Sequence, residues 1–110
     1  MFDAAKFIEA ARAASKSKPV AITLPTIGAA FKKKLTVVDI EHAGTVREKL
    51  SSAGKLDRSM GIAIGLAQCI CGPDGECVFD VDNSDHLEIL AALPWESVRG
   101  LMTGEDAGND

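Results

Sequence analysis

The sequence predicts an α+β fold that is mainly α-helical, with four to five helices and one small β-hairpin in the N-terminal half. Apolar residues recur at helical spacing over most of the chain. Two short segments, residues 20–24 and 31–35, alternate apolar and polar side chains instead. Glycine, proline and small polar residues separate these segments. We expect residues 1–104 to form one globular domain and residues 105–110 to be an acidic, disordered tail.

The first helix is predicted at residues 4–15. Asp3 is a suitable N-cap for it. Phe2 precedes that cap and Phe7 lies four positions into the helix, which is the spacing of a hydrophobic staple. The apolar stripe of this helix consists of Phe7, Ala11 and Ala14.

The two alternating segments form the predicted hairpin. Residues 25–28 lie between them and contain the proline and glycine that are typical of turns. An isolated hairpin is marginally stable in water, so we expect this one to pack on helices.

The second helix is predicted to follow Thr36 and to end near residue 52. Thr36 and Asp39 have the spacing of a capping box, with a shorter acid than usual. Gly54 is a natural C-terminal stop. The side chains expected to face inward are Ile40, Ala43, Val46 and Leu50.

The third helix is predicted from residue 55 or 56 to residue 70, and it is apolar nearly all round. Such a helix belongs at the centre of a fold, with Cys69 mostly buried on it. A short extended piece is expected at residues 76–80. A fourth helix is expected at residues 85–93, capped by Asp82, Asn83 or Ser84. A last helix begins at Pro94 and ends at Gly104.

Charge and composition argue against several functional classes. The chain has 12 basic and 16 acidic residues and a net charge of −4, which disfavours binding to nucleic acid. Its longest apolar run is too short to cross a bilayer, and we expect no membrane association. Three closely spaced cysteines are more typical of a reducing cytoplasm than of a disulfide framework.

Two groups of residues could bind metal. Cys69, Cys71, Cys77 and His86 are soft ligands, but their spacing differs from common zinc motifs, and buried or incidental thiols are the alternative. Residues 80–85 resemble a calcium loop. Asp85 stands where that loop needs glycine and Ala91 where it needs glutamate, so helix capping is the favoured interpretation. We expect no metal and no cofactor.

No catalytic set is apparent in the sequence. His42 and His86 are the only histidines, and they fall on different predicted helices. Neither a nucleophile elbow nor a glycine-rich loop with a phosphate-binding lysine is present. The sequence therefore predicts a binding protein and not an enzyme.

Two segments resemble the tail assembly chaperones of long-tailed, siphovirus-type bacteriophages. Residues 24–41 are similar to the family's strand, proline–glycine turn, second strand and Leu-Thr helix start followed by an acidic residue. Residues 74–90 are similar to its aspartate–glycine turn, phenylalanine-containing piece and acidic-capped helix with leucines. The likeness covers about residues 20–103, without the first helix and Trp95.

The resemblance implies a protein that binds the tape measure protein and helps to recruit tail tube subunits during tail assembly. It implies a cytoplasmic location in the host, absence from the mature virion, and a homo-oligomer that binds by multivalent apolar contacts. The alternatives are a small regulatory adaptor and a Cys/His metal-binding module.

Six apolar side chains are the predicted partner contacts. Trp95 is either a contact or a core anchor of the last helix, since tryptophan serves both purposes. Near the N-terminus, Phe2, Phe7 and Ile8 either mediate self-association or pack on their own domain. The candidates are Trp95, Leu101, Met102, Phe2, Phe7 and Ile8.

Overall fold

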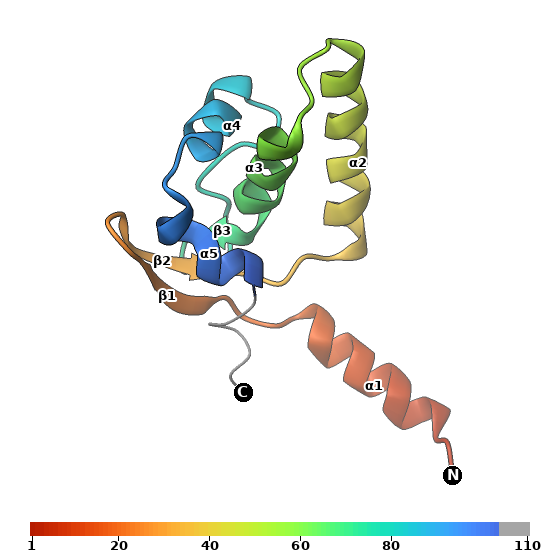
Figure 1. Cartoon of the computed structure of the whole chain (residues 1–110). Coiled ribbons are helices and arrows are strands. Elements are labelled where there is room, and N and C mark those ends of the chain that lie inside the picture. Colours follow the sequence, from red (N-terminus) through yellow and green to blue (C-terminus); the bar gives the residue numbers. More distant parts are fainter. Residues whose placement is uncertain (104–110) are drawn as a thin grey trace.

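The computed structural model describes residues 1–103 and confirms the predicted fold class (Figure 1). The described residues form five helices and one three-stranded antiparallel sheet, in the strand order β1-β2-β3. Gly104 and the expected tail at 105–110 lie outside the described residues. The elements are α1 (Ala4–Ser15), β1 (Val20–Leu24), β2 (Gly28–Lys32), α2 (Val37–Ser52), α3 (Arg58–Cys69), β3 (Ile70–Cys71), α4 (Ser84–Ala91) and α5 (Trp95–Thr103).

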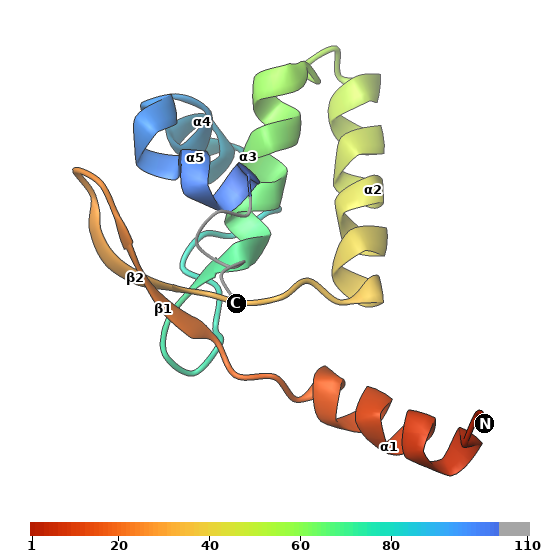
Figure 2. The ribbon, with the colours of Figure 1, turned by 60° about the horizontal axis from the view of Figure 1, so that its bottom comes forward.

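Helix α3 lies at the centre of the fold, as its apolar sequence predicts. It stands between α2 and α4, and the sheet lies at its C-terminal end (Figures 1 and 2). Gln68 is buried on α3, and its Nε2 donates to the carbonyl of Asp39 at 2.6 Å, which ties α3 to the first turn of α2. The core is made of Leu24, Ala43, Val46, Ala63, Ile64, Leu66, Ala67, Ile70, Leu87, Leu90 and Val98.

The start of α3 is later than predicted. It begins at Arg58 because Asp57 is the N-cap, with its Oδ1 accepting the Met60 N–H at 2.9 Å. A side-chain oxygen in this position satisfies a backbone donor that the helix itself leaves unpaired.

The ends of α2 confirm the prediction, but one inward residue was wrong. Thr36 and Asp39 form a reciprocal capping box, and Gly54 follows the helix with φ +72°. The buried or partly buried side chains of α2 are spaced four, three and four residues apart, at Asp39, Ala43, Val46 and Leu50. Ile40 lies a quarter-turn from the face that they form and is 58% exposed.

The second hairpin strand begins earlier than predicted, at Gly28 instead of residue 31. The turn takes only residues 25–27, and Leu24 pairs directly with Gly28. Thr26 in this turn has φ +66°, and Gly28, the first residue of β2, has φ +129°. The tight turn moves the whole second strand toward the N-terminus.

A third strand begins at Ile70, which was predicted to be the last residue of the third helix. Ile70 leaves the helix in an extended conformation and pairs with Lys32, and Cys71 pairs with Phe31. The Lys33 N–H donates to the Cys69 carbonyl at 3.0 Å. Pairing with the exposed edge of the hairpin thus ends the helix. Residues 76–80 form no strand and contribute one isolated bridge, between Cys77 and Cys71.

The last two helices are close to their predicted positions. Asn83 caps α4, with its Oδ1 accepting the N–H groups of Asp85 and His86 at 2.9 and 3.3 Å. The helix ends at Ala91, two residues earlier than predicted. Helix α5 begins directly after Pro94.

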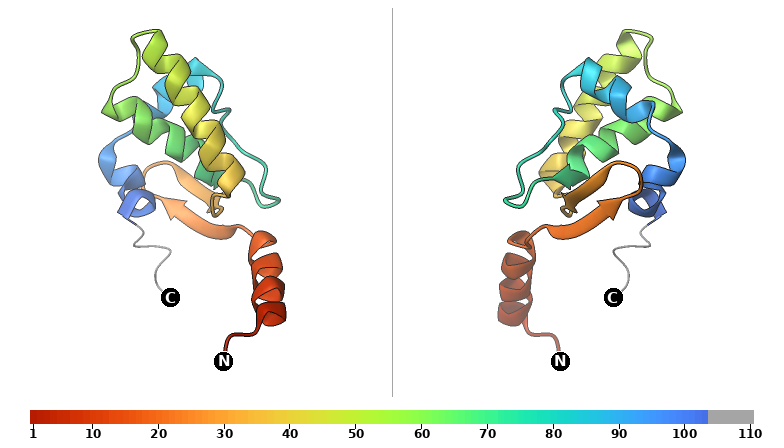
Figure 3. Two further views of the ribbon diagram at one scale, coloured as in Figure 1. Left: turned by 90° about the vertical axis from the view of Figure 1, so that its right-hand side faces the viewer. Right: turned by 90° about the vertical axis from the view of Figure 1, so that its left-hand side faces the viewer.

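Helix α1 extends away from the other elements (Figure 3). None of its residues is buried. The radius of gyration is 15.6 Å, whereas a compact chain of this length has about 13 Å. The rings of Phe2 and Phe7 lie 5.7 Å apart between centroids, which confirms the predicted staple contact.

Candidate functional site

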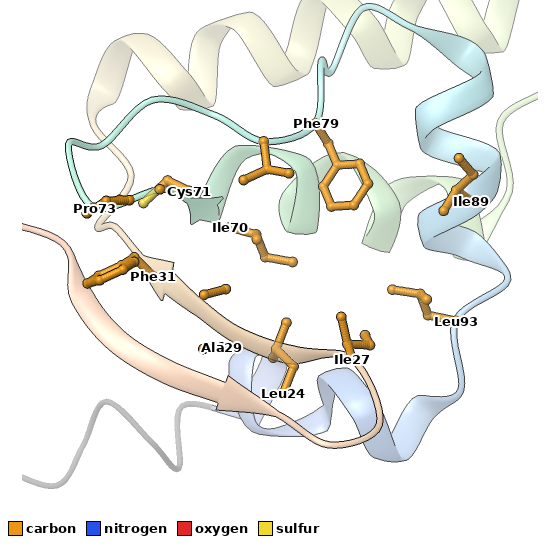
Figure 4. A pocket seen from close by; sticks show the side chains of 13 residues that line it. Leu24, Ile27, Ala29, Phe31, Ile70, Cys71, Pro73, Phe79, Ile89 and Leu93 are labelled. Atoms are coloured by element: carbon orange, nitrogen blue, oxygen red, sulfur yellow. The ribbon is translucent and has the colours of Figure 1, made fainter.

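An apolar cleft lies between the hairpin, the loop after β3, and α4 (Figure 4). Its volume is about 460 Å³. The hairpin side chains point into it from one side, Phe79 from the opposite side, and Ile89 and Leu93 from the end near α4. The cleft is lined by Leu24, Ile27, Ala29, Ala30, Phe31, Ile70, Cys71, Gly72, Pro73, Val78, Phe79, Ile89 and Leu93.

The floor and the mouth of the cleft differ in exposure. Ile70 and Cys71 at the floor are buried and belong to the packed interior. Ile27, Val78 and Ile89 are 50, 56 and 53% exposed. Covering these three half-exposed side chains would contribute on the order of 1 kcal/mol each, since full burial of such a side chain contributes about 1.5–3 kcal/mol. Covering the mouth of the cleft would therefore lower the free energy of the protein.

The lining has no group for acid–base, nucleophilic or phosphate chemistry apart from the buried Cys71 thiol. Burial raises the pKa of that thiol, and the Lys33 charge opposes the rise only in part. A protonated thiol at a closed floor is a weak nucleophile. The cleft can bind an apolar side chain or an apolar helix face.

The hairpin turn that carries Ile27 is held in an unfavourable conformation. Thr26 adopts the left-handed region at φ +66°, which is uncommon for a β-branched residue and costs about 1–3 kcal/mol. Its Oγ1 hydrogen-bonds to Oγ of the buried Ser97 at 2.8 Å. This bond anchors the turn to α5 and holds Ile27 at the mouth of the cleft.

The charged groups that suggested a calcium loop have structural partners. The Asp82 N–H donates to Asp80 Oδ1 at 2.9 Å, and Asp82 Oδ2 lies 3.1 Å from His42 Nε2. His86 Nδ1 accepts the Asp80 N–H at 2.9 Å. These contacts confirm the capping and turn interpretation of residues 80–85. Within residues 1–103, no cluster of three or more His, Cys, Asp or Glu side chains has a metal-binding arrangement.

The three cysteines differ in burial. Cys69, the last residue of α3, is partly buried and packs against the core, in line with the expectation that most of its side chain is buried. Cys71 in β3 is fully buried, and Cys77 is exposed.

The six predicted contact residues fall in two separate places. On α1, Phe2, Phe7 and Ile8 are 74, 63 and 57% exposed. On α5, Trp95 is 48% exposed and Leu101 is partly buried against the core. Val98, and not Trp95, anchors α5 in the core. Met102 belongs to α5, but its side chain lies outside the described part of the structure.

Sequence reasoning missed the cleft. Its mouth is built from Ile27, Val78 and Ile89, which come from a turn, a loop and the outer face of a helix. One signal was available, because large apolar residues at positions assigned to turns or to solvent faces are candidates for a binding surface.

Comparisons with known proteins yield no relative. No family model matches the chain, and no match is found among curated proteins or solved structures. The longest helix, α2, has 16 residues, and no helix within residues 1–103 has the length and hydropathy needed to cross a bilayer.

Proposed function

We propose that this chain is a tail assembly chaperone of a long-tailed bacteriophage, which binds the tape measure protein and helps to recruit tail tube subunits. It would act in the host cytoplasm during assembly and be absent from the mature virion. The observation that carries the proposal is the apolar cleft. The two segments that resemble the family, residues 24–41 and 74–90, contribute opposite sides of this cleft.

The cleft suits an apolar helix face of the tape measure protein. Such a face presents side chains at spacings of three and four residues. In the helix-in-groove mode of recognition, side chains with this spacing insert into an apolar groove. Each copy of the chain would contribute only a few kcal/mol through Ile27, Val78 and Ile89, so stable coating of a long partner requires many copies.

Helix α1 is the proposed contact between copies. Ala4, Phe7, Ile8 and Ala11 follow the i, i+3, i+4, i+7 pattern of a helix that binds through one face. None of these residues is buried within the chain. Packing this stripe on a second copy would link neighbouring chaperones along the partner.

Co-expression with the tape measure protein of the same genome tests the proposal. Wild type should keep the tape measure protein soluble at both low and high salt, because apolar contacts are not screened. Ile89→Asp should lower the amount of complex at least about tenfold, because an interface that buries an unpaired carboxylate is strongly penalised.

The matched control is Ile40→Asp. This isoleucine is also helical and 58% exposed, but it does not line the cleft. Its variant should keep wild-type binding. Equal loss in both variants would point to a general surface effect, and a wild type that never keeps the tape measure protein soluble would refute the function.

A second pair of variants tests α1. Phe7→Asp should reduce the molar mass measured by light scattering if the stripe joins copies. Ala5→Asp adds the same charge to the opposite face of the same helix and should leave the mass unchanged. A wild type that is monomeric at high concentration would remove self-association from the proposal.

A further inference from the structure

Two cysteines face each other across a short ladder at the edge of the cleft. Cys71 in β3 and Cys77 in the following loop form an isolated antiparallel bridge. Next to this pair, the Gly72 N–H donates to the Glu76 carbonyl at 2.9 Å. Gly72 follows Cys71 and Glu76 precedes Cys77, so this hydrogen bond lies beside the cysteine pair and not within it. The two cysteines are therefore a non-hydrogen-bonded pair of the antiparallel ladder.

This kind of pair is suited to a cross-strand disulfide. Directly opposed residues at a non-hydrogen-bonded position have Cα atoms about 4.5 Å apart, and a disulfide accepts Cα separations of about 4.4–6.8 Å. The turn between them is fixed by the Gly75 N–H, which donates to the Gly72 carbonyl at 3.0 Å, and by the φ of +87° at Gly75. The two Cβ atoms are therefore presented to the same side of the ladder.

We propose that Cys71 and Cys77 are a redox modification site, which forms an intrachain disulfide with a small disulfide oxidant such as oxidised glutathione. The inference rests on strand register alone, and it stands whether or not the chain is a tail assembly chaperone. Cys69 does not take part, because it is the last residue of α3 and has no position in this ladder.

The different exposure of the two sulfurs fixes the order of the steps. Cys77 is exposed and Cys71 is fully buried. The Cys77 thiolate attacks one sulfur of oxidised glutathione, which forms a mixed disulfide and releases one glutathione thiolate. The second step is slower, because the buried Cys71 thiol must first lose its proton to solvent. The Cys71 thiolate then attacks the neighbouring Cys77 sulfur and releases the second glutathione thiolate, which takes up a proton. Two protein thiols lose two protons and two electrons, and one oxidised glutathione becomes two reduced molecules.

The cross-link would act on one wall of the cleft. Cys71 lines the cleft, and the ring closed by the disulfide contains Gly72 and Pro73, which also line it. Closing this ring would add a covalent link to that wall, which the reduced chain holds by the backbone hydrogen bonds of the turn and by the pairing of Cys71 with Phe31.

The experiment uses full-length Cys69→Ser, which retains only the two proposed partners. The folded protein is incubated with excess oxidised glutathione, and the intact mass should fall by about 2 Da as two hydrogens are lost. Cleavage before aspartate separates residues 57–73 from residues 74–79. These two peptides should remain joined until a reductant is added.

Cys71→Ser serves as the control for access to Cys77. It should stop at the mixed disulfide and gain one glutathionyl group. If Cys69→Ser also stops at this adduct, Cys71 cannot reach its partner in the fold and the proposal is overturned. A wild-type disulfide that maps to Cys69 would overturn it as well.

Discussion

Helices α1 and α3 have the same length of 12 residues, and each begins after an aspartate N-cap. Their surroundings are opposite. Helix α3 has five buried residues, while α1 has none. The comparison shows that capping and length specify a helix locally, whereas burial decides whether the helix contributes to the stability of the fold.

The distribution of apolar side chains explains the difference. Helix α3 is apolar nearly all round, and full burial of Ile64 and Leu66 contributes about 1.5–3 kcal/mol each. Helix α1 has a single stripe, and its opposite face carries Lys6, Glu9 and Arg12. A 12-residue helix without tertiary packing is marginally stable in water. Within residues 1–103, nothing packs over the apolar stripe of α1, so the helix gains no stability from burial.

Hydrogen exchange should show the largest contrast between the two helices. In dilute solution, amides of α3 should exchange only through global unfolding, while amides of α1 exchange by local fraying. Global stability of small proteins is about 5–15 kcal/mol, so the rates should differ by at least about a thousand-fold. At high concentration, self-association through α1 should slow its exchange. Equal protection of both helices in a dilute monomer would contradict the comparison.

A matched pair of isoleucines should show the next largest effect. Ile64→Ala in α3 should lower the free energy of unfolding by about 2–5 kcal/mol, because the side chain is fully buried and leaves a cavity. Ile8→Ala in α1 should change it by less than about 0.5 kcal/mol, because that side chain is 57% exposed. Urea unfolding of both variants measures the contrast. Comparable losses would mean that α1 packs on the body.

The sequence predicted local features better than tertiary ones. The caps Asp3, Thr36 and Asn83 and the glycine stop after α2 follow from short-range backbone chemistry, and the structure confirms them. The hairpin also follows from alternation, but the length of its turn does not, since a left-handed Thr26 is not expected from propensity.

Features that depend on neighbouring elements could not be predicted. Strand β3 exists because the hairpin offers an open edge to Ile70, which residue patterns alone would extend as helix. The cleft likewise depends on three elements meeting, with Ile27 and Ile89 brought together from positions 62 residues apart in the chain. Periodicity predicts which face of one element is apolar, and it does not predict which of these faces remain uncovered.

The two N-caps provide a finer test. Thr36→Ala should lower the free energy of unfolding by about 1 kcal/mol, because it removes the capping box of a packed helix. Asp3→Ala removes the cap of α1 and should reduce the helical circular dichroism signal without moving the unfolding midpoint. A shift of that midpoint in Asp3→Ala, equal to the shift in Thr36→Ala, would show that α1 unfolds together with the body.

The smallest expected effect concerns the charge of the cap of α3. Hydrogen bonds from the Met60 N–H and the Ser59 hydroxyl lower the pKa of Asp57 from its usual 3.8. The carboxylate form is thus favoured in the folded chain, and its contribution to stability is present above the unfolded pKa and is lost as pH falls through the folded one.

Asp57→Asn keeps a capping oxygen and removes the charge. Wild type should therefore have the higher midpoint of thermal unfolding at neutral pH, and the difference should begin to shrink near pH 4 and disappear at lower pH. The effect should be modest, because the carboxylate is fully exposed to solvent. Glu48→Gln removes one negative charge from the exposed face of α2 and controls for net charge. A difference between wild type and Asp57→Asn that persists unchanged into strong acid would show that lost packing, and not the carboxylate charge, distinguishes the two proteins.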